Sequence, residues 1–271
     1  IRLSLVGSEM CIRDRYGMTS FFPVGPARKL ASCTFEYTYF ARPDSQLGGT
    51  LLYEAREAMG AALAREFPVD ADMVIGVPDS ATAAAIGYAR EAGIPFREGL
   101  VKNRYVGRTF IQPDQRIREA GVSLKFNALS AVLRGKRVVV VDDSIVRGTT
   151  TPRVLALIRK AGAAEVHMRI TTPPIVSPCF FGVDMATKSE LISANKSIEE
   201  IRQHIGANSL GFLSLEGLNK ATGQASETLC NACFTGVYPS DVQGQLDKLD
   251  AVRKKDLVLA ASDSLNRAGG P

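Results

Sequence analysis

The chain has 271 residues, of which 45% are hydrophobic and 23% are charged, an ordinary balance for a globular protein. Its net charge of +5 is ordinarily interpreted as a solvated surface; the functional interpretation is an anionic small-molecule substrate rather than nucleic acid, because no block of lysine and arginine is dense. No apolar run approaches the roughly 20 residues of a membrane helix, and the presence of only two histidines makes histidine-centred catalysis a poor candidate.

The first residues differ in character from the rest of the chain. Val6–Arg15 resembles a translated sequencing adapter and shows no clear hydrophobic period. We therefore expect residues 1–20 to be a non-native or disordered leader, residues 21–240 to form the main domain, and residues 241–271 to form a C-terminal helix and tail. Five cysteines without a convincing secretory signal indicate a reducing, cytoplasmic setting, where thiols are buried residues, metal ligands or nucleophiles.

Apolar strands alternate with amphipathic helices through the middle of the chain. The four consecutive valines of Lys136–Val141 predict a strand that is buried on both faces. Strand–helix–strand alternation favours an α/β fold with a parallel sheet flanked by helices. The other predicted strands are Met73–Val77, Phe96–Val101 and Glu165–Ile170. The predicted helices are Thr50–Phe67, Ala81–Ala92, Thr151–Ala161 and Ser197–Ile205.

A charged stretch, Lys102–Asn127, interrupts this alternation. It has little apolar periodicity and contains glycine and proline, so it is either a disordered segment or a working lid. Its first part, KNRYVGRTF, combines cations with a tyrosine, a composition that suits a lid closing over a polyphosphate.

The strongest motif is VVVVDDSIVRGTT, which spans Val138–Thr150. A buried strand delivers Asp142 and Asp143 to its carboxyl end, where ligands bind in open α/β sheets. The turn that follows, together with the next helix N-terminus, presents backbone N–H groups suited to a phosphate monoester. The carboxylates suit two ribose hydroxyls or a Mg²⁺ ion that bridges to pyrophosphate.

A second strand–turn–helix motif is GVPDSATAAAIGYA, which spans Gly76–Ala89. Like the first, it presents backbone donors at an edge of the sheet. Taken alone, Pro-Asp-Ser before a helix is usually an ordinary N-cap, so this motif gains its meaning from the paired aspartates.

The paired-aspartate motif resembles the phosphoribosylpyrophosphate (PRPP) loop of type I phosphoribosyltransferases, and its amino-acid sequence is similar to that of the amidophosphoribosyltransferases. The resemblance runs from about Ala31 to Asp241. It implies the type I phosphoribosyltransferase fold with a C-terminal Cys-containing segment. In this family ammonia displaces pyrophosphate from C1 of PRPP and gives phosphoribosylamine, which begins purine synthesis.

The resemblance also implies roles for individual residues. Asp142, Asp143 and Lys102 would be catalytic, and Mg²⁺ would be held at Ser80, Asp142 and Asp143. The substrate-binding residues would be Asp79, Ser80, Arg104, Tyr105, Ser144, Val146, Arg147, Gly148, Thr149 and Thr150. Within that set, the loop from Val146 to Thr150 would bind the 5-phosphate, and Ser80 and Lys102 would lie on the pyrophosphate side.

Complete members of the family carry a glutaminase whose first residue is a cysteine nucleophile, and nothing here matches it. We therefore expect the glutaminase, which is normally in cis, to be absent and the chain to use ammonia. We also expect a homo-oligomer. Two alternatives stay open: a PRPP-binding regulator, and another type I phosphoribosyltransferase acting on a base.

Four cysteines outside the leader form the last candidate site. Cys230 and Cys233 make a CxxC motif, while Cys33 and Cys179 are scattered. Four thiolates could hold Zn²⁺ or a cluster on physical grounds, and buried thiols are the ordinary interpretation. The resemblance to the iron–sulfur subclass of the family implies that all four bind one [4Fe–4S] cluster.

Overall fold

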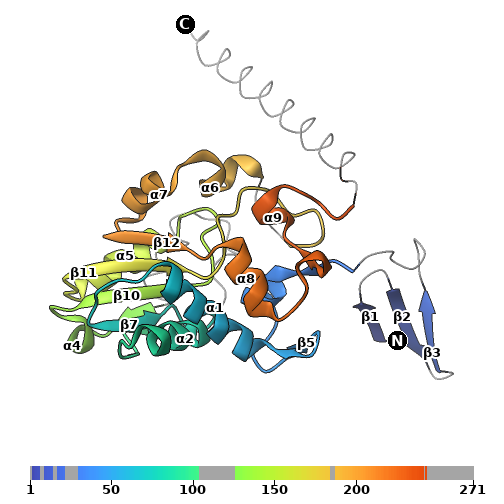
Figure 1. Cartoon of the computed structure of the whole chain (residues 1–271), viewed down its shortest axis with the longest axis horizontal. Coiled ribbons are helices and arrows are strands. Elements are labelled where there is room, and N and C mark those ends of the chain that lie inside the picture. The colour runs from blue at the N-terminus through green and yellow to red at the C-terminus, as the bar shows by residue number, and fades with distance from the viewer. Residues whose placement is uncertain are drawn as a thin grey trace, which may run out of the picture.

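The computed structural model describes the backbone of strands in residues 2–6, 9–14 and 17–21, and residues 30–103, 126–183, 187–240 and 242 in full (Figure 1). Its centre is a four-stranded parallel sheet with the order β12-β11-β10-β7. The strands are β7 (Met73–Gly76), β10 (Arg137–Asp142), β11 (Glu165–Ile170) and β12 (Ser209–Phe212). The predicted parallel sheet is confirmed.

The middle strand β10 is buried as its valines predict. Val138, Val139, Val140 and Val141 have no exposed surface, because β7 and β11 pair with β10 on both edges while helices cover both faces. Burying these side chains stabilises the fold by roughly 1.5–3 kcal/mol each.

Helices α1 (Leu52–Glu66) and α2 (Thr82–Ala92) lie on one side of the sheet, and α5 (Thr151–Lys160) and α7 (Ile198–Ile205) lie on the other (Figure 1). The first two helices touch through glycines. A Cβ atom on Gly60 would lie 1.8 Å from the Ala84 carbonyl oxygen, and one on Gly87 would lie 2.0 Å from that of Glu57. Only glycine allows these two backbones to pack so closely. All four helices were predicted, with bounds shifted by one or two residues.

The predicted strand Phe96–Val101 is wrong in its first half. Phe96 makes only an isolated parallel bridge to Val74, and the chain then turns away from the central sheet. Pairing resumes in β8 (Leu100–Lys102), which is antiparallel to β9 (Phe126–Ala128). The predicted lid, including Arg104 and Tyr105, falls at residues 104–125 outside the described residues.

Short elements complete the domain and bring its beginning and end together. Strand β4 (Ser32–Cys33) pairs in parallel with β13 (Leu229–Cys230), so that Cys33 lies opposite Cys230. The remaining short elements are η1 (Glu36–Phe40), β5 (Gln46–Leu47), β6 (Thr50–Leu51), α4 (Ser130–Leu133), η3 (Lys188–Glu190), α6 (Ile192–Asn195), α8 (Leu215–Thr222), η4 (Ser226–Thr228) and α9 (Ala232–Thr235).

Before this domain, β1 (Arg2–Val6), β2 (Glu9–Asp14) and β3 (Gly17–Phe21) form an antiparallel sheet. The sequence predicts no regular structure here, because these residues show no hydrophobic period. That residues 1–20 are a non-native leader stays a prediction. The predicted C-terminal helix lies outside the described residues. No helix in the described ranges has both the length and the apolar character needed to cross a bilayer.

Candidate functional site

The connections of the sheet diverge between β7 and β10, and the region beyond the carboxyl ends of these two strands is called the crevice below. After β7 the chain passes through α2 to the bridge at Phe96 on one side, whereas after β10 it passes through α5 to β11 on the other. The two strands are parallel, with Gly76 opposite Val141, so both end at the same edge of the sheet. A reversal of strand order at such an edge is where ligands bind in open α/β sheets.

The paired aspartates lie at this crevice. The Asp143 side chain is buried, at 8% exposure, and accepts a 2.6 Å hydrogen bond from the Ser144 hydroxyl. Asp142 accepts the backbone N–H of Asp143 at 2.9 Å. Burial raises the pKa of Asp143 above its ordinary value, while hydrogen bonds from Ser144 and Ser80 act in the opposite direction. The structure thus brings Ser80, which precedes α2, to the carboxylate that follows β10.

Two supporting residues were missed by sequence reasoning. Thr171, just after β11, donates its hydroxyl to the Asp143 carbonyl oxygen at 3.3 Å. Arg56 on α1 is 4% exposed, donates to the carbonyl oxygens of Tyr37 and Ala41, and its charge opposes the rise in the pKa of Asp143. A signal for Arg56 was present in the sequence, because its spacing places an arginine within the apolar stripe of α1.

The predicted phosphate loop, Val146–Thr150, follows the turn after the paired aspartates and leads into the first turn of α5. Gly148 has a φ of +67°, a conformation that side chains with a Cβ rarely adopt. Val146 is partly buried and Gly148 is buried, whereas Arg147, Thr149 and Thr150 are exposed. The loop therefore has one side packed against the domain and one side open at the N-terminus of a ten-residue helix, which favours an anion.

The second motif faces the same crevice. A Cβ atom on Gly76 would lie 3.1 Å from the Ala81 carbonyl oxygen, so the turn folds closely over the end of β7. The peptide bond between Pro78 and Asp79 in this turn is cis. Lys102 at the end of β8 donates to Asp79 at 2.5 Å, which places the predicted lysine beside the turn.

The oxygen donors at the crevice fit Mg²⁺. In the described part of the chain, no group of three or more His, Cys, Asp or Glu side chains is placed to hold a metal ion by itself. Mg²⁺ that binds together with a phosphorylated substrate needs only one or two carboxylates, because phosphate oxygens and water complete its shell. Asp142 and Asp143 supply such carboxylates at one edge of the sheet.

The four cysteines outside the leader line one pocket, although they come from three distant parts of the domain. The pocket has a volume of only about 20 Å³ and is lined by Cys33, Phe35, Cys179, Phe181, Val183, Cys230, Ala232 and Cys233. Burial raises the pKa of Cys33 to about 11 and raises those of Cys230 and Cys233, so these thiols are neutral without a cation. Thiolates are the ligand type that iron–sulfur clusters take, and the positive irons of a cluster would allow these thiols to ionise. As they lie in the described part of the chain, however, the cysteines do not form a group placed to hold a metal ion.

Known proteins resemble the chain over most of its length. A family model described as the phosphoribosyl transferase domain matches residues 51–171. Curated amidophosphoribosyltransferases from Methanocaldococcus jannaschii and Bacillus subtilis are 56% and 49% identical over 84% and 88% of this chain. A solved structure, glutamine phosphoribosylpyrophosphate (PRPP) amidotransferase from B. subtilis complexed with ADP and GMP, matches 87% of the chain with a TM-score of 0.76 and 52% identity. The chain covers 49%, 55% and 52% of these three proteins, so it spans about half the length of the relatives it matches.

Proposed function

Because the chain belongs to the amidophosphoribosyltransferases and has their type I phosphoribosyltransferase fold, we propose that it transfers ammonia to C1 of PRPP. The products would be pyrophosphate and 5-phosphoribosylamine, and the reaction would begin purine synthesis. One observation carries the proposal: Ser144 of the turn after β10 and Ser80 of the second strand–turn–helix motif both hydrogen-bond to one buried carboxylate, Asp143, at the switch point of the sheet.

Each part of PRPP has a candidate partner in this crevice. The N–H groups of Val146–Thr150 and the α5 N-terminus bind the 5-phosphate, and Asp142 and Asp143 accept hydrogen bonds from the ribose hydroxyls. Asp79, Ser80 and Lys102 bind the pyrophosphate, with the Lys102 ammonium exchanging Asp79 for a phosphate oxygen. Ammonia is already a nucleophile, so the protein has to position the sugar and stabilise developing charge rather than supply a base.

Mg²⁺ would be held at Asp142, Asp143 and Ser80. When bound, it would neutralise charge on the pyrophosphate leaving group. The described residues contribute by keeping these oxygens together: Thr171 anchors the Asp143 backbone, and the buried Arg56 supplies a positive charge near its carboxylate.

Pyrophosphate release from PRPP tests the function directly. We expect turnover with ammonium salts and none with purine or pyrimidine bases; a rate only with a base would instead identify another type I phosphoribosyltransferase. Tight PRPP binding without turnover on any acceptor would favour the PRPP-binding regulator. A parallel assay with glutamine in place of ammonium salts tests the expectation that these 271 residues carry no glutaminase. We also propose a cytoplasmic homo-oligomer, which sedimentation of the purified protein would test.

The cysteine pocket is proposed to hold a [4Fe–4S] cluster with a structural role, because the proposed reaction transfers no electrons. Anaerobically purified protein should be brown and contain iron and acid-labile sulfide. Changing Cys230→Ser should abolish the colour and lower the thermal stability, whereas the matched Cys11→Ser control should change neither. Stoichiometric zinc without iron in anaerobic protein would contradict the cluster.

A further inference from the structure

One segment, Glu190–His204, holds the packed side of the phosphate loop. The Ile192 backbone N–H donates to the Val146 carbonyl oxygen at 3.0 Å. On the neighbouring helix α7, His204 Nε2 lies 3.1 Å from the Gly148 carbonyl oxygen. A carbonyl oxygen can only accept, so the imidazole must carry its hydrogen on Nε2. The carbonyl groups of Val146 and Gly148, two residues apart in the loop, are therefore both anchored by this segment.

Because the peptide bond is planar, anchoring a carbonyl group also fixes the direction of the N–H group that follows it. In a trans peptide the C=O and the following N–H point in opposite directions. Anchoring the Val146 and Gly148 carbonyls to residues 190–204 therefore turns the N–H groups of Arg147 and Thr149 away from that segment. They face the side of the loop where the 5-phosphate is proposed to bind.

Packing supports the same orientation. At the positive φ of Gly148, a Cβ atom would lie 2.4 Å from Ile192 Cδ1, so the Ile192 side chain also presses on this side of the loop. The ion pair between Arg147 and Glu190, at 3.7 Å, adds little because both side chains are about half exposed. His204 is thus the side chain of this segment that contributes a hydrogen bond to a loop carbonyl.

We propose that His204 is a positioning residue for the 5-phosphate: its hydrogen bond to the Gly148 carbonyl holds the Thr149 N–H toward the phosphate. This inference rests on the proposed function, because it assumes that the loop binds the 5-phosphate of PRPP. It goes further by assigning a role to a helix that contributes no residue to the paired-aspartate motif.

The test compares two ligands that occupy different halves of the crevice. Ribose 5-phosphate carries the 5-phosphate, whereas Mg²⁺–pyrophosphate binds on the side of Ser80 and Lys102. By calorimetry, His204→Leu should weaken ribose 5-phosphate binding about 3- to 10-fold, the effect of losing one hydrogen bond, and leave pyrophosphate binding unchanged. His204→Gln, which keeps an N–H donor, should restore most of the affinity. Gln203→Leu, which removes a hydrogen bond to Glu199 on the same helix, is the matched control and should alter neither ligand.

The outcomes separate this inference from the proposed function. Wild-type protein that binds neither ligand nor PRPP would overturn both. If wild-type protein binds ribose 5-phosphate and His204→Leu binds it equally well, the positioning role is wrong while the function stands. Equal weakening of both ligands, or a His204→Gln variant as weak as His204→Leu, would likewise overturn the hydrogen bond as the cause.

Discussion

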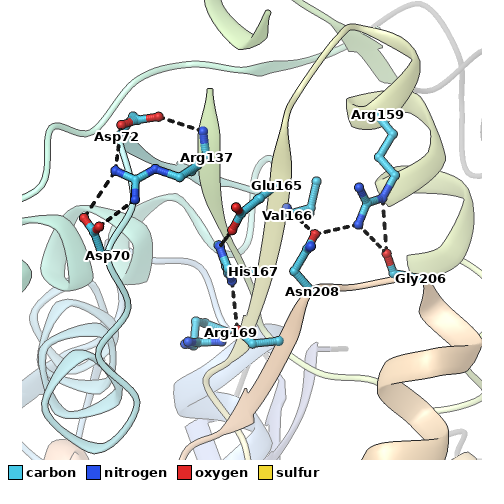
Figure 2. A network of polar contacts seen from close by, with 11 residues as sticks. Asp70, Asp72, Arg137, Arg159, Glu165, Val166, His167, Arg169, Gly206 and Asn208 are labelled. Carbon is cyan, nitrogen blue, oxygen red and sulfur yellow. Dashed lines mark hydrogen bonds and ion pairs between the residues drawn. The ribbon is translucent and has the colours of Figure 1, made fainter. Parts of the chain in front are cut away.

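Polar side chains are paired differently at the two edges of the central sheet. At the amino edge, polar side chains pair with one another (Figure 2): Arg137 binds Asp70 and Asp72, and His167 lies between Glu165 and Ser209. The carboxyl edge instead gathers a buried carboxylate, a positive-φ turn and the Thr172 hydroxyl, which is buried and has no hydrogen-bond partner among the described residues.

This difference separates residues that hold the fold from residues that bind the substrate. A buried polar group stabilises a protein only when it is hydrogen-bonded, and one left without a partner costs roughly 1–3 kcal/mol. The amino edge meets this requirement within the protein. At the carboxyl edge the Thr172 hydroxyl has no such partner among the described residues, and we expect it to gain one when PRPP binds. Substitutions should therefore reduce stability at one edge and turnover at the other.

The largest effect is expected from Asp142→Asn combined with Asp143→Asn. The change keeps side-chain size but removes the charge that binds Mg²⁺ and the ribose hydroxyls, so kcat/KM for PRPP should fall at least about 100-fold. Thermal stability should not fall appreciably, because a neutral amide avoids the desolvation that burial imposes on the Asp143 carboxylate. A double variant within a few-fold of wild type would mean that these carboxylates only shape a turn.

A smaller effect, on stability alone, is expected from Arg169→Met. The Arg169 backbone lies near the carboxyl end of β11, but its side chain donates to the Ser209 hydroxyl at the start of β12. Arg169 is 3% exposed and donates to the carbonyl oxygens of Phe67 and Met168, each at 2.9 Å. Its loss should lower the free energy of unfolding by about 2 kcal/mol, measured in urea, with kcat/KM near wild type. Arg159→Met, at an exposed position of the same network, is the control and should cost less. A large loss of turnover in Arg169→Met would contradict the proposed division between residues that hold the fold and residues that bind the substrate.

The smallest effect should appear in the pH dependence of stability. Burial, followed by the nearby charge of Arg169, lowers the pKa of His167 below its ordinary value of 6.5. Above that pH neither the folded nor the unfolded state is protonated at this histidine. As the pH falls below 6.5, the unfolded state takes up the proton first, so stability declines until the folded-state pKa is reached. His167→Gln should flatten this decline in thermal melts across that range, and parallel profiles for the two proteins would contradict it.

The sequence predicts the local parts of the site well. Four valines and two aspartates in succession specify a doubly buried strand and the turn after it, because burial and turn formation are both determined within a few residues. The same is true of α1, α2, α5 and α7, whose apolar stripes match the buried residues. The resemblance to the family predicted that Asp143 and Ser80 belong to one site, and the structure brings them together because the two motifs end at the same edge of the sheet.

Features that depend on distant neighbours could not be predicted. Phe96–Val101 reads as one apolar strand, yet its partner changes from Val74 to β9 within it, and no sequence period reports a change of partner. The roles of Arg56 and His204 depend on helices that pack against the site from elsewhere in the chain. His204 contacts a carbonyl 56 residues away. Nothing in the spacing of His204 indicates that contact.

The pairing of β4 with β13 has a consequence for how the protein is made on the ribosome. The Thr34 hydroxyl donates to the Cys230 carbonyl oxygen, and these residues are 196 positions apart. At about 5–20 residues per second, translation leaves Cys33 and its neighbours without their partner strand for roughly 10–40 s. Phe35 stacks on Phe234 in the finished protein, so the nascent chain exposes this aromatic ring throughout that interval. Chaperone binding early in synthesis should therefore centre on the segment around Phe35 and end when Phe234 emerges.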